Sequence, residues 1–315
     1  MHSGFAIAIA WPETLCQKAG AWYDLPMSWL KISRDDFYKV GHSAVILVSD
    51  ESKSCSYYDF GRYHSPEGFG RVRSSNSDRD LEIKTNVTYS QCGTKIENLH
   101  DLLIELNSNP STHGDGHVAA SVTRVDYDLA SSYALSLQTK DFLRYGPFIT
   151  PGTNCSRFVR DVIRAGKPPM AKKVLLKYPP MISPSPLWNV QAVGMGDEVI
   201  RLKKPFIEKI SKAPSAKSIP QNSLWLGGTG AGSWFSIVKI DVSSSTSDEQ
   251  FEVERYSPTG ELECSGVFKL DSSQGTSELN IELDMSKLKI LYPSNCNGVV
   301  FEFEGDVFVL NKLKG

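Results

Sequence analysis

The sequence predicts an α+β protein of two domains joined by a proline-rich connection, and three observations support this. Residues 1–170 alternate apolar runs suited to strands with stretches of helical spacing. Residues 171–222 are rich in proline and lysine, which predicts an extended connection. Residues 223–315 hold short strands separated by turns, a pattern typical of a small antiparallel β-sandwich or barrel.

Composition limits the binding partners and the cellular compartments that we expect for this protein. A net charge of -2 gives no electrostatic reason to expect nucleic acid, and no apolar run is long enough to span a membrane. The apolar run at 5–11 lacks a basic segment before it, so we interpret it as a buried strand and not a signal peptide. This predicts a cytoplasmic protein and leaves export without a cleaved signal open.

The cysteines and histidines show no spacing typical of a metal site. The six cysteines are scattered with no C-x-x-C pair, so neither a zinc cluster nor a disulfide framework is expected. His113 and His117 are four residues apart, but the glycines between them indicate a loop. We therefore predict no metal and no cofactor.

The first loop after the N-terminal strand carries two aromatic residues and a carboxylate: Trp22, Tyr23 and Asp24. They either pack on the core or form a wall of the substrate site. The β-branched run at 40–48 and the strand at 55–60 flank a polar turn, which predicts a hairpin.

A glycine- and arginine-rich loop follows the hairpin at 61–73. Arg62, Arg71 and Arg73 either hold an anionic substrate or pair with the acidic residues just downstream, at 78–82. Further along, the patterns predict strands at 83–89 and 118–125 and helices at 96–106 and 129–142.

The stretch 152–166 is a loop that turns into a helix. Phe158, Val159, Val162 and Ile163 form one apolar stripe, Asn154 or Thr153 is a suitable N-cap, and Gly166 is a suitable stop. Cys155 therefore lies in the first helical turn, where unpaired N–H groups and the helix dipole stabilise a thiolate. The alternative is a small buried apolar residue, as most free cysteines are.

A thiol nucleophile needs a histidine to exchange its proton and a polar group to orient that histidine. His42 begins the first hairpin strand, and Asp59 falls near it on the second. A core histidine satisfied by hydrogen bonds is the alternative for His42. His64 is a second choice for the orienting role, and Tyr57 and Tyr58 are candidates for lining the site.

These residues carry a resemblance to a known family. Gly41-His42 opening an apolar strand, Tyr58-Asp59-Phe60-Gly61 ending the next strand, and Asn154-Cys155-x-x-Phe158 opening a helix resemble the circularly permuted papain-like cysteine hydrolases. That branch includes NlpC-like peptidases and lecithin retinol acyltransferase-like enzymes, and in it the histidine precedes the cysteine. The acyltransferase-like members have a histidine where this chain offers Asp59.

The resemblance implies a cysteine hydrolase with Cys155 as nucleophile, His42 as base and Asp59 as the third polar residue. The expected reaction is cleavage of an amide bond through a thioester, on a cell-wall peptide held by Trp22, Tyr23, Asp24, Tyr58, Arg62 and His64. The alternatives are an acyltransferase or thioesterase acting on lipid-like acyl groups, or a non-enzymatic binding module. The β-domain either covers the first domain or binds a protein partner.

Overall fold

The computed structural model divides the chain into two compact units. The first comprises Met1–Gly61, Gly68–Ser75 and Leu81–Glu208, and the second comprises Arg62–Glu67, Asn76–Asp80 and Lys209–Gly315. The structure describes residues 2–14, 16–17, 33–34, 37–38, 40–114, 116–181, 183–195, 200–202, 219–226, 233–240, 249–256, 260, 262–271 and 287–313.

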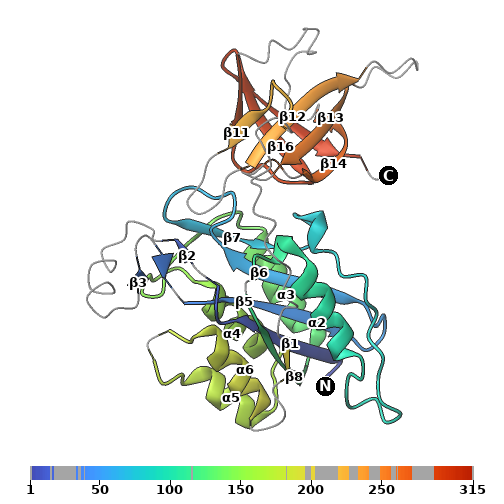
Figure 1. Ribbon diagram of the computed structural model, residues 1–315, viewed down its shortest axis with the longest axis vertical. Coiled ribbons are helices and arrows are strands. Elements are labelled where there is room, and N and C mark those ends of the chain that lie inside the picture. Colours follow the sequence, from blue (N-terminus) through green and yellow to red (C-terminus); the bar gives the residue numbers. More distant parts are fainter. Residues whose placement is uncertain are drawn as a thin grey trace. The chain divides into compact units, whose positions relative to one another are not determined.

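Unit 1 is built around one antiparallel sheet of seven strands (Figure 1). Its order is β10 (Ile200–Leu202), β8 (Val118–Val125), β1 (Gly4–Trp11), β5 (His42–Ser49), β6 (Cys55–Gly61), β7 (Phe69–Arg73) and β9 (Leu143–Arg144). All eight residues of β1 are buried, which explains why its sequence is continuously apolar. The predicted hairpin at 40–60 is present as β5 and β6.

Helices cover both faces of this sheet. Ala6, Ala8 and Val45 pack with the apolar stripe of α4 (Cys155–Ala165), alongside α3 (Tyr127–Gln138). On the other face Ile7 and Ile46 pack with α2 (Leu99–Ser108). Alternate residues of the strands therefore belong to two separate hydrophobic cores, one on each face of the sheet.

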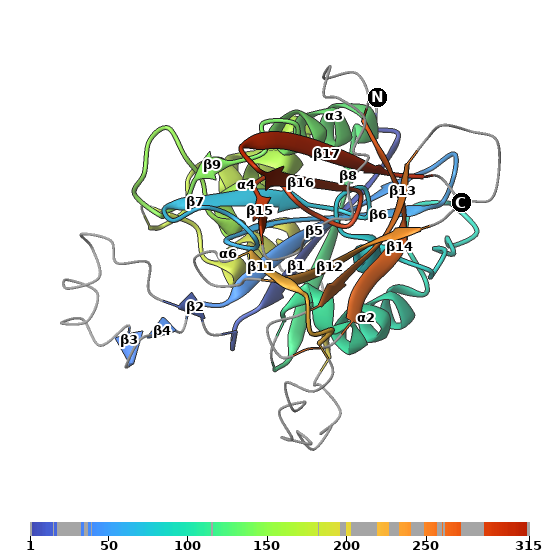
Figure 2. The same ribbon diagram turned by 90° about the horizontal axis from the view of Figure 1, so that it is seen from above.

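Short elements complete unit 1. A 3-10 turn lies at η2 (Pro110–Thr112), and another, η1 (Arg79–Leu81), lies where the chain returns from unit 2 to unit 1. The strands β2 (Cys16–Gln17), β4 (Phe37–Tyr38) and β3 (Ser33–Arg34) form a small three-stranded sheet, labelled in Figure 2.

The prediction that 171–222 is extended throughout was wrong for its first part. Helices α5 (Met170–Lys177) and α6 (Pro186–Gly194) lie there and are followed by β10. The prolines mark where these helices begin: Pro169 is the N-cap of α5, and Pro186 follows the Ser185 N-cap of α6. Proline is compatible with the first turn, where its missing N–H has no intrahelical acceptor.

The strand predicted at 83–89 is also absent from the described chain. The backbone N–H groups of Lys84 and Thr85 donate to the Glu105 carboxylate at 2.7 and 2.9 Å instead of to a neighbouring strand. A side chain of α2 therefore satisfies backbone donors that a sheet would otherwise pair.

Unit 2 contains a second antiparallel sheet of seven strands. Its order is β11 (Leu224–Leu226), β12 (Ser233–Ile240), β13 (Gln250–Tyr256), β14 (Leu262–Leu270), β17 (Asp306–Lys312), β16 (Gly298–Phe303) and β15 (Leu288–Leu291). The first and last strands of this order approach each other, so the sheet is nearly closed. The overall class is α+β with two domains, the second barrel-like.

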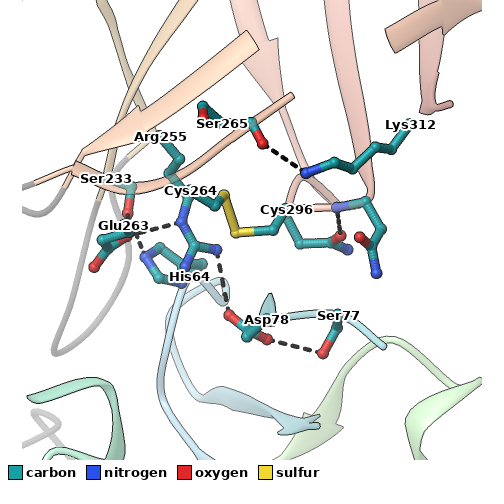
Figure 3. The surroundings of a disulfide bond; sticks show 12 residues. His64, Ser77, Asp78, Ser233, Arg255, Glu263, Cys264, Ser265, Cys296 and Lys312 are labelled. Atoms are coloured by element: carbon teal, nitrogen blue, oxygen red, sulfur yellow. Dashed lines mark hydrogen bonds and ion pairs between the residues drawn. A yellow bond between two sulfur atoms is a disulfide. The ribbon is translucent and has the colours of Figure 1, made fainter. Parts of the chain in front are cut away.

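A disulfide joins Cys264 to Cys296 inside unit 2 (Figure 3). The expectation of no disulfide framework was therefore wrong at this pair. The two cysteines are 32 residues apart in sequence, and only the pairing of distant strands brings them together. Within the part of the chain that the structure describes, no helix is long and apolar enough to cross a bilayer.

Candidate active site

The candidate site is formed where β5 and α4 begin. Cys155 is the first residue of α4, and the Asn154 side chain caps the helix by accepting a hydrogen bond from the Arg157 N–H at 2.8 Å. Capping satisfies one donor of the first turn. The N–H groups of Cys155 and Ser156 are in the same turn, where helical geometry offers them no intrahelical acceptor.

His42 and Asp59 meet across the hairpin. Asp59 is the register partner of Ala44, so His42 lies two residues away and its side chain emerges on the same face of the sheet. The Nε2 atom of His42 is 3.2 Å from Oδ2 of Asp59. The ring of Trp11 stacks on the imidazole with centroids 5.7 Å apart. A carboxylate and an indole thus fix the orientation of the imidazole.

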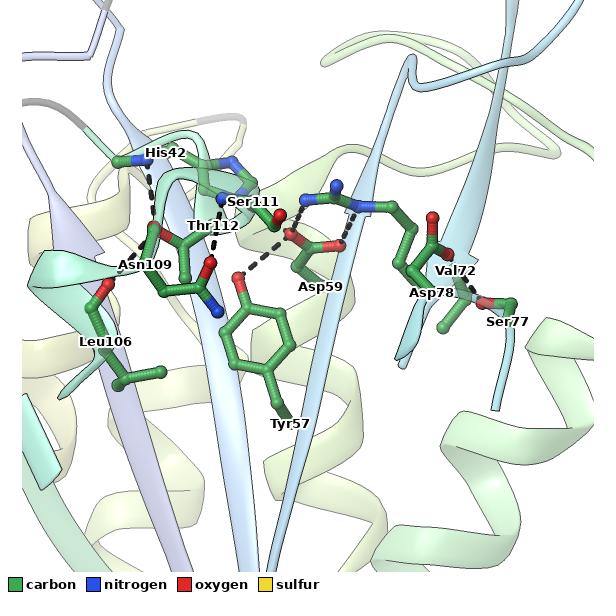
Figure 4. Close-up of polar contacts among 12 residues, drawn as sticks. His42, Tyr57, Asp59, Val72, Ser77, Asp78, Leu106, Asn109, Ser111 and Thr112 are labelled. Carbon is green, nitrogen blue, oxygen red and sulfur yellow. Dashed lines mark hydrogen bonds and ion pairs between the residues drawn. The ribbon is translucent and has the colours of Figure 1, made fainter. Parts of the chain in front are cut away.

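Two further donors hold Asp59, which is fully buried. Arg73 donates from Nε at 3.0 Å and from Nη2 at 2.6 Å. The Tyr57 hydroxyl donates at 3.0 Å, as Figure 4 shows. Burial raises the pKa of Asp59, but the Arg73 charge and the bonds from His42 and Arg73 outweigh it and lower that pKa. Asp59 is therefore a carboxylate at neutral pH.

The same contacts govern the charge of His42. Burial lowers its pKa, but the hydrogen bonds to Asp59 and Cys155 and the charges of both raise it to about 9. His42 is accordingly an imidazolium at neutral pH, with the Cys155 thiol within hydrogen-bonding reach. The site therefore places a proton donor beside the thiol.

Cys155 is held from several sides and retains 7% exposure. The Ser156 hydroxyl lies 3.8 Å from its sulfur, and Asn189 of α6 donates to the Ser156 carbonyl at 2.8 Å. The Asn154 side chain also donates to the Ser183 hydroxyl at 3.0 Å. These hydrogen bonds connect the first turn of α4 to α6 and to the residues just before α6.

The predicted lining residues have different surroundings. Tyr58 points to the opposite face from Asp59 and belongs to the core around α4, because neighbouring strand residues alternate. Arg62 is buried in unit 2, as is His64, whose Nε2 is 2.5 Å from the Ser233 hydroxyl. That these three residues line the substrate site stays a prediction. Trp22, Tyr23 and Asp24 lie outside the described residues.

The sequence patterns missed three residues that hold the site: Trp11, Tyr57 as a donor to Asp59, and Arg73. Tyr57 is two residues from Asp59 on one strand, so alternation places both on one face and was a usable signal. Arg73 is on the strand after β6, where it pairs directly with Asp59 in the register. Its partner was expected among the acidic residues at 78–82, because the sequence does not give that register.

Among the described residues, no group of three or more His, Cys, Asp or Glu side chains is arranged to hold a metal ion. The groups that the site does bring together are a thiol, an imidazolium and a buried carboxylate, beside backbone amides at a helix start.

Comparison with known proteins agrees with the division into two parts. Residues 6–169 match the family model described as type VI secretion system effector TseH-like, and residues 223–313 match the DUF6695 C-terminal domain. No curated protein matches the sequence. The crystal structure of the type VI secretion system effector TseH aligns with 64% of this chain and 94% of that one, at 19% identity and a TM-score of 0.44. With over half of its length matched by the first family model, the chain belongs to the TseH-like family of type VI secretion system effectors.

Proposed function

We propose that this protein is a hydrolase effector that cleaves an amide bond in a cell-wall peptide through a thioester on Cys155. The observation that carries the proposal is the placement of the Cys155 thiol beside His42, which Asp59 in turn orients. This is the nucleophile, base and orienting group that thiol-dependent acyl transfer requires. By the resemblance of its motifs, we assign residues 1–170 to a circularly permuted papain-like fold.

The geometry supports a definite sequence of proton transfers. Since Nε2 of His42 faces Asp59, we assign Nδ1 to the thiol. The Cys155 thiolate attacks the amide carbonyl carbon, and the oxyanion that forms accepts hydrogen bonds from backbone amides at the start of α4. The imidazolium then protonates the leaving amine, the C–N bond breaks, and a thioester remains.

Hydrolysis of the thioester completes the cycle. Neutral His42 takes a proton from water, and the resulting hydroxide attacks the thioester carbonyl carbon. The C–S bond breaks, releasing a carboxylic acid and the Cys155 thiolate. Asp59 stays ionised throughout and stabilises the imidazolium each time it forms.

The test uses purified protein and its Cys155→Ala variant with muropeptides and isopeptide substrates, and mass spectrometry identifies the products. We expect new amine and carboxyl termini with the parent protein alone. Cleavage that survives Cys155→Ala would remove this cysteine from the mechanism. Acyl transfer to or from lipid-like esters is tested on the same samples, and an unreactive thiol together with no turnover would favour a binding module.

A further inference from the structure

The arginines predicted to hold carboxylates are not available for that role. Arg62, Arg71 and Arg73 are all buried, and Arg73 is paired with Asp59. Other cations of unit 1 are gathered in a different part of the chain. Residues 162–196 contain five Lys or Arg side chains and no Asp or Glu.

Helix α5, which lies in this stretch, exposes apolar side chains. Met170, Val174 and Tyr178 recur every four residues, so they share one helix face, and they are 72%, 48% and 64% exposed. Met181 just beyond is 52% exposed. The opposite face of α5 anchors it to unit 1 through the fully buried Leu176.

Lysines flank this apolar face. Lys167 and Lys177 are exposed and Lys173 is half-buried, while the Lys177 ammonium lies 5.0 Å from the centroid of the Tyr178 ring. We refer to these residues as the α5 surface: Lys167, Lys173, Lys177, Met170, Val174, Tyr178 and Met181. Exposed apolar groups clustered in this way mark interaction sites.

The chain that follows the α5 surface reaches the candidate active site. Ser183, two residues beyond Met181, accepts a hydrogen bond from Asn154, the residue before Cys155. Pro186, at the start of α6, packs against Gly41, the residue before His42: a Cβ at Gly41 would lie 3.3 Å from its ring. The chain that leaves α5 therefore passes both proposed catalytic residues.

We propose that the α5 surface docks peptidoglycan, an anionic polymer whose stem peptides carry carboxylates, and feeds it to Cys155. The proposal rests on the proposed function. Complementary charge attracts the polymer to the lysines, and the apolar side chains add contact area.

The experiment measures binding without turnover. Every protein carries Cys155→Ala, and co-sedimentation with purified sacculi is followed at about 50 and about 300 mM NaCl. The docking variant is Lys167→Gln/Lys173→Gln/Lys177→Gln, and a second variant is Met170→Ser/Tyr178→Ser. The matched control is Lys84→Gln/Lys95→Gln/Lys140→Gln, which changes three exposed lysines elsewhere on unit 1 and gives the same net charge.

We expect salt-sensitive binding that weakens about tenfold in either docking variant and stays unchanged in the control. Equal binding by all variants, or no binding by the Cys155→Ala protein, would overturn the proposal. Retention on phosphatidylglycerol vesicles but not on sacculi would overturn it in favour of a lipid surface. Circular dichroism melting confirms that each variant is folded. Because turnover is absent from this assay, its outcome is independent of whether Cys155 is the nucleophile.

Discussion

Burial and hydrogen bonding shift the pKa of His42 in opposite directions. Burial favours the neutral ring, while Asp59 and Cys155 favour the imidazolium and prevail, raising the pKa to about 9. The consequence is a positively charged His42 beside the Cys155 thiol at neutral pH. Two predictions test this charge state, and a third tests the group that supports Asp59.

The first prediction concerns the reactivity of Cys155. Iodoacetamide should alkylate it faster than an ordinary thiol at pH 7, and His42→Ala should slow the reaction at least about tenfold, because the neighbouring cation that favours the thiolate is lost. Peptide mapping by mass spectrometry follows each cysteine separately. Cys55 is an internal control, since burial and Glu105 raise its pKa to about 12. Equal rates at Cys155 in parent and variant would contradict the pairing.

The second prediction concerns the pH dependence of amide cleavage. Protonation of the leaving amine requires imidazolium, so activity should fall as pH rises through about 9. Asp59→Asn removes a charge and a charge-assisted bond that raise the pKa of His42, and the falling limb should then move to lower pH. If the falling limb of the pH profile stays at the same pH in Asp59→Asn, then Asp59 does not raise the pKa of His42.

The third prediction concerns the buried pair between Arg73 and Asp59. Arg73→Met removes the guanidinium from the buried Asp59 carboxylate, which then keeps only His42 and Tyr57 as partners, and should reduce the free energy of unfolding by about 3–5 kcal/mol. The control is Arg124→Met: Arg124 also lies 2.6 Å from its partner, Asp50, but the two side chains are 30% and 36% exposed. That change should cost about 1 kcal/mol. Urea unfolding measures both, and equal losses would refute the argument from burial.

At the scale of elements, the start of α4 sets the position of the nucleophile. The Asn154 side chain makes two hydrogen bonds. Its Oδ1 atom caps the helix, and its Nδ2 atom donates to the Ser183 hydroxyl. Both groups fix the first turn, which carries Cys155 and the amides proposed to bind the oxyanion.

The fourth prediction separates these two roles. Asn154→Ala should lower stability by about 1 kcal/mol through loss of the cap. Asn154→Asp keeps the cap acceptor but removes the donor to Ser183, so its stability should stay near that of the parent while turnover falls. Thermal unfolding and cleavage rates measure the two effects. A loss of stability in the Asp variant as large as in the Ala variant would argue against the division.

At the scale of the whole molecule, unit 2 depends on contacts between distant segments. The disulfide connects β14 to the residues before β16, and Arg255 of β13 pairs with Asp78, 3.2 Å away (Figure 3). The cytoplasmic location stays a prediction.

The fifth prediction concerns this disulfide. Cys264→Ser/Cys296→Ser should lower the stability of unit 2 by about 3–4 kcal/mol, because the bond closes a loop of 32 residues in the unfolded chain. Hydrogen exchange of the full chain, read at β14 and β16, measures the change. Replacement of the exposed Cys92 by Ser is the control and should have no effect. Unchanged protection at both strands would show that the bond adds nothing to stability.

The sequence by itself determined the hairpin of β5 and β6, the start of α4 at Cys155 and the antiparallel strands in the described part of residues 223–315. These features depend on local periodicity, capping and turn residues, which neighbouring positions encode. Alternation along two adjacent strands was also enough to predict that Asp59 would lie beside His42.

Only the tertiary structure decided which distant groups complete the site. Arg73 reaches Asp59 through the register of β7 on β6, and Trp11 reaches His42 through the register of β1 on β5. The same holds for the Cys264–Cys296 bond and for the exposure of α5. Such contacts depend on how separate elements pack, and no local pattern specifies packing between residues far apart in the chain.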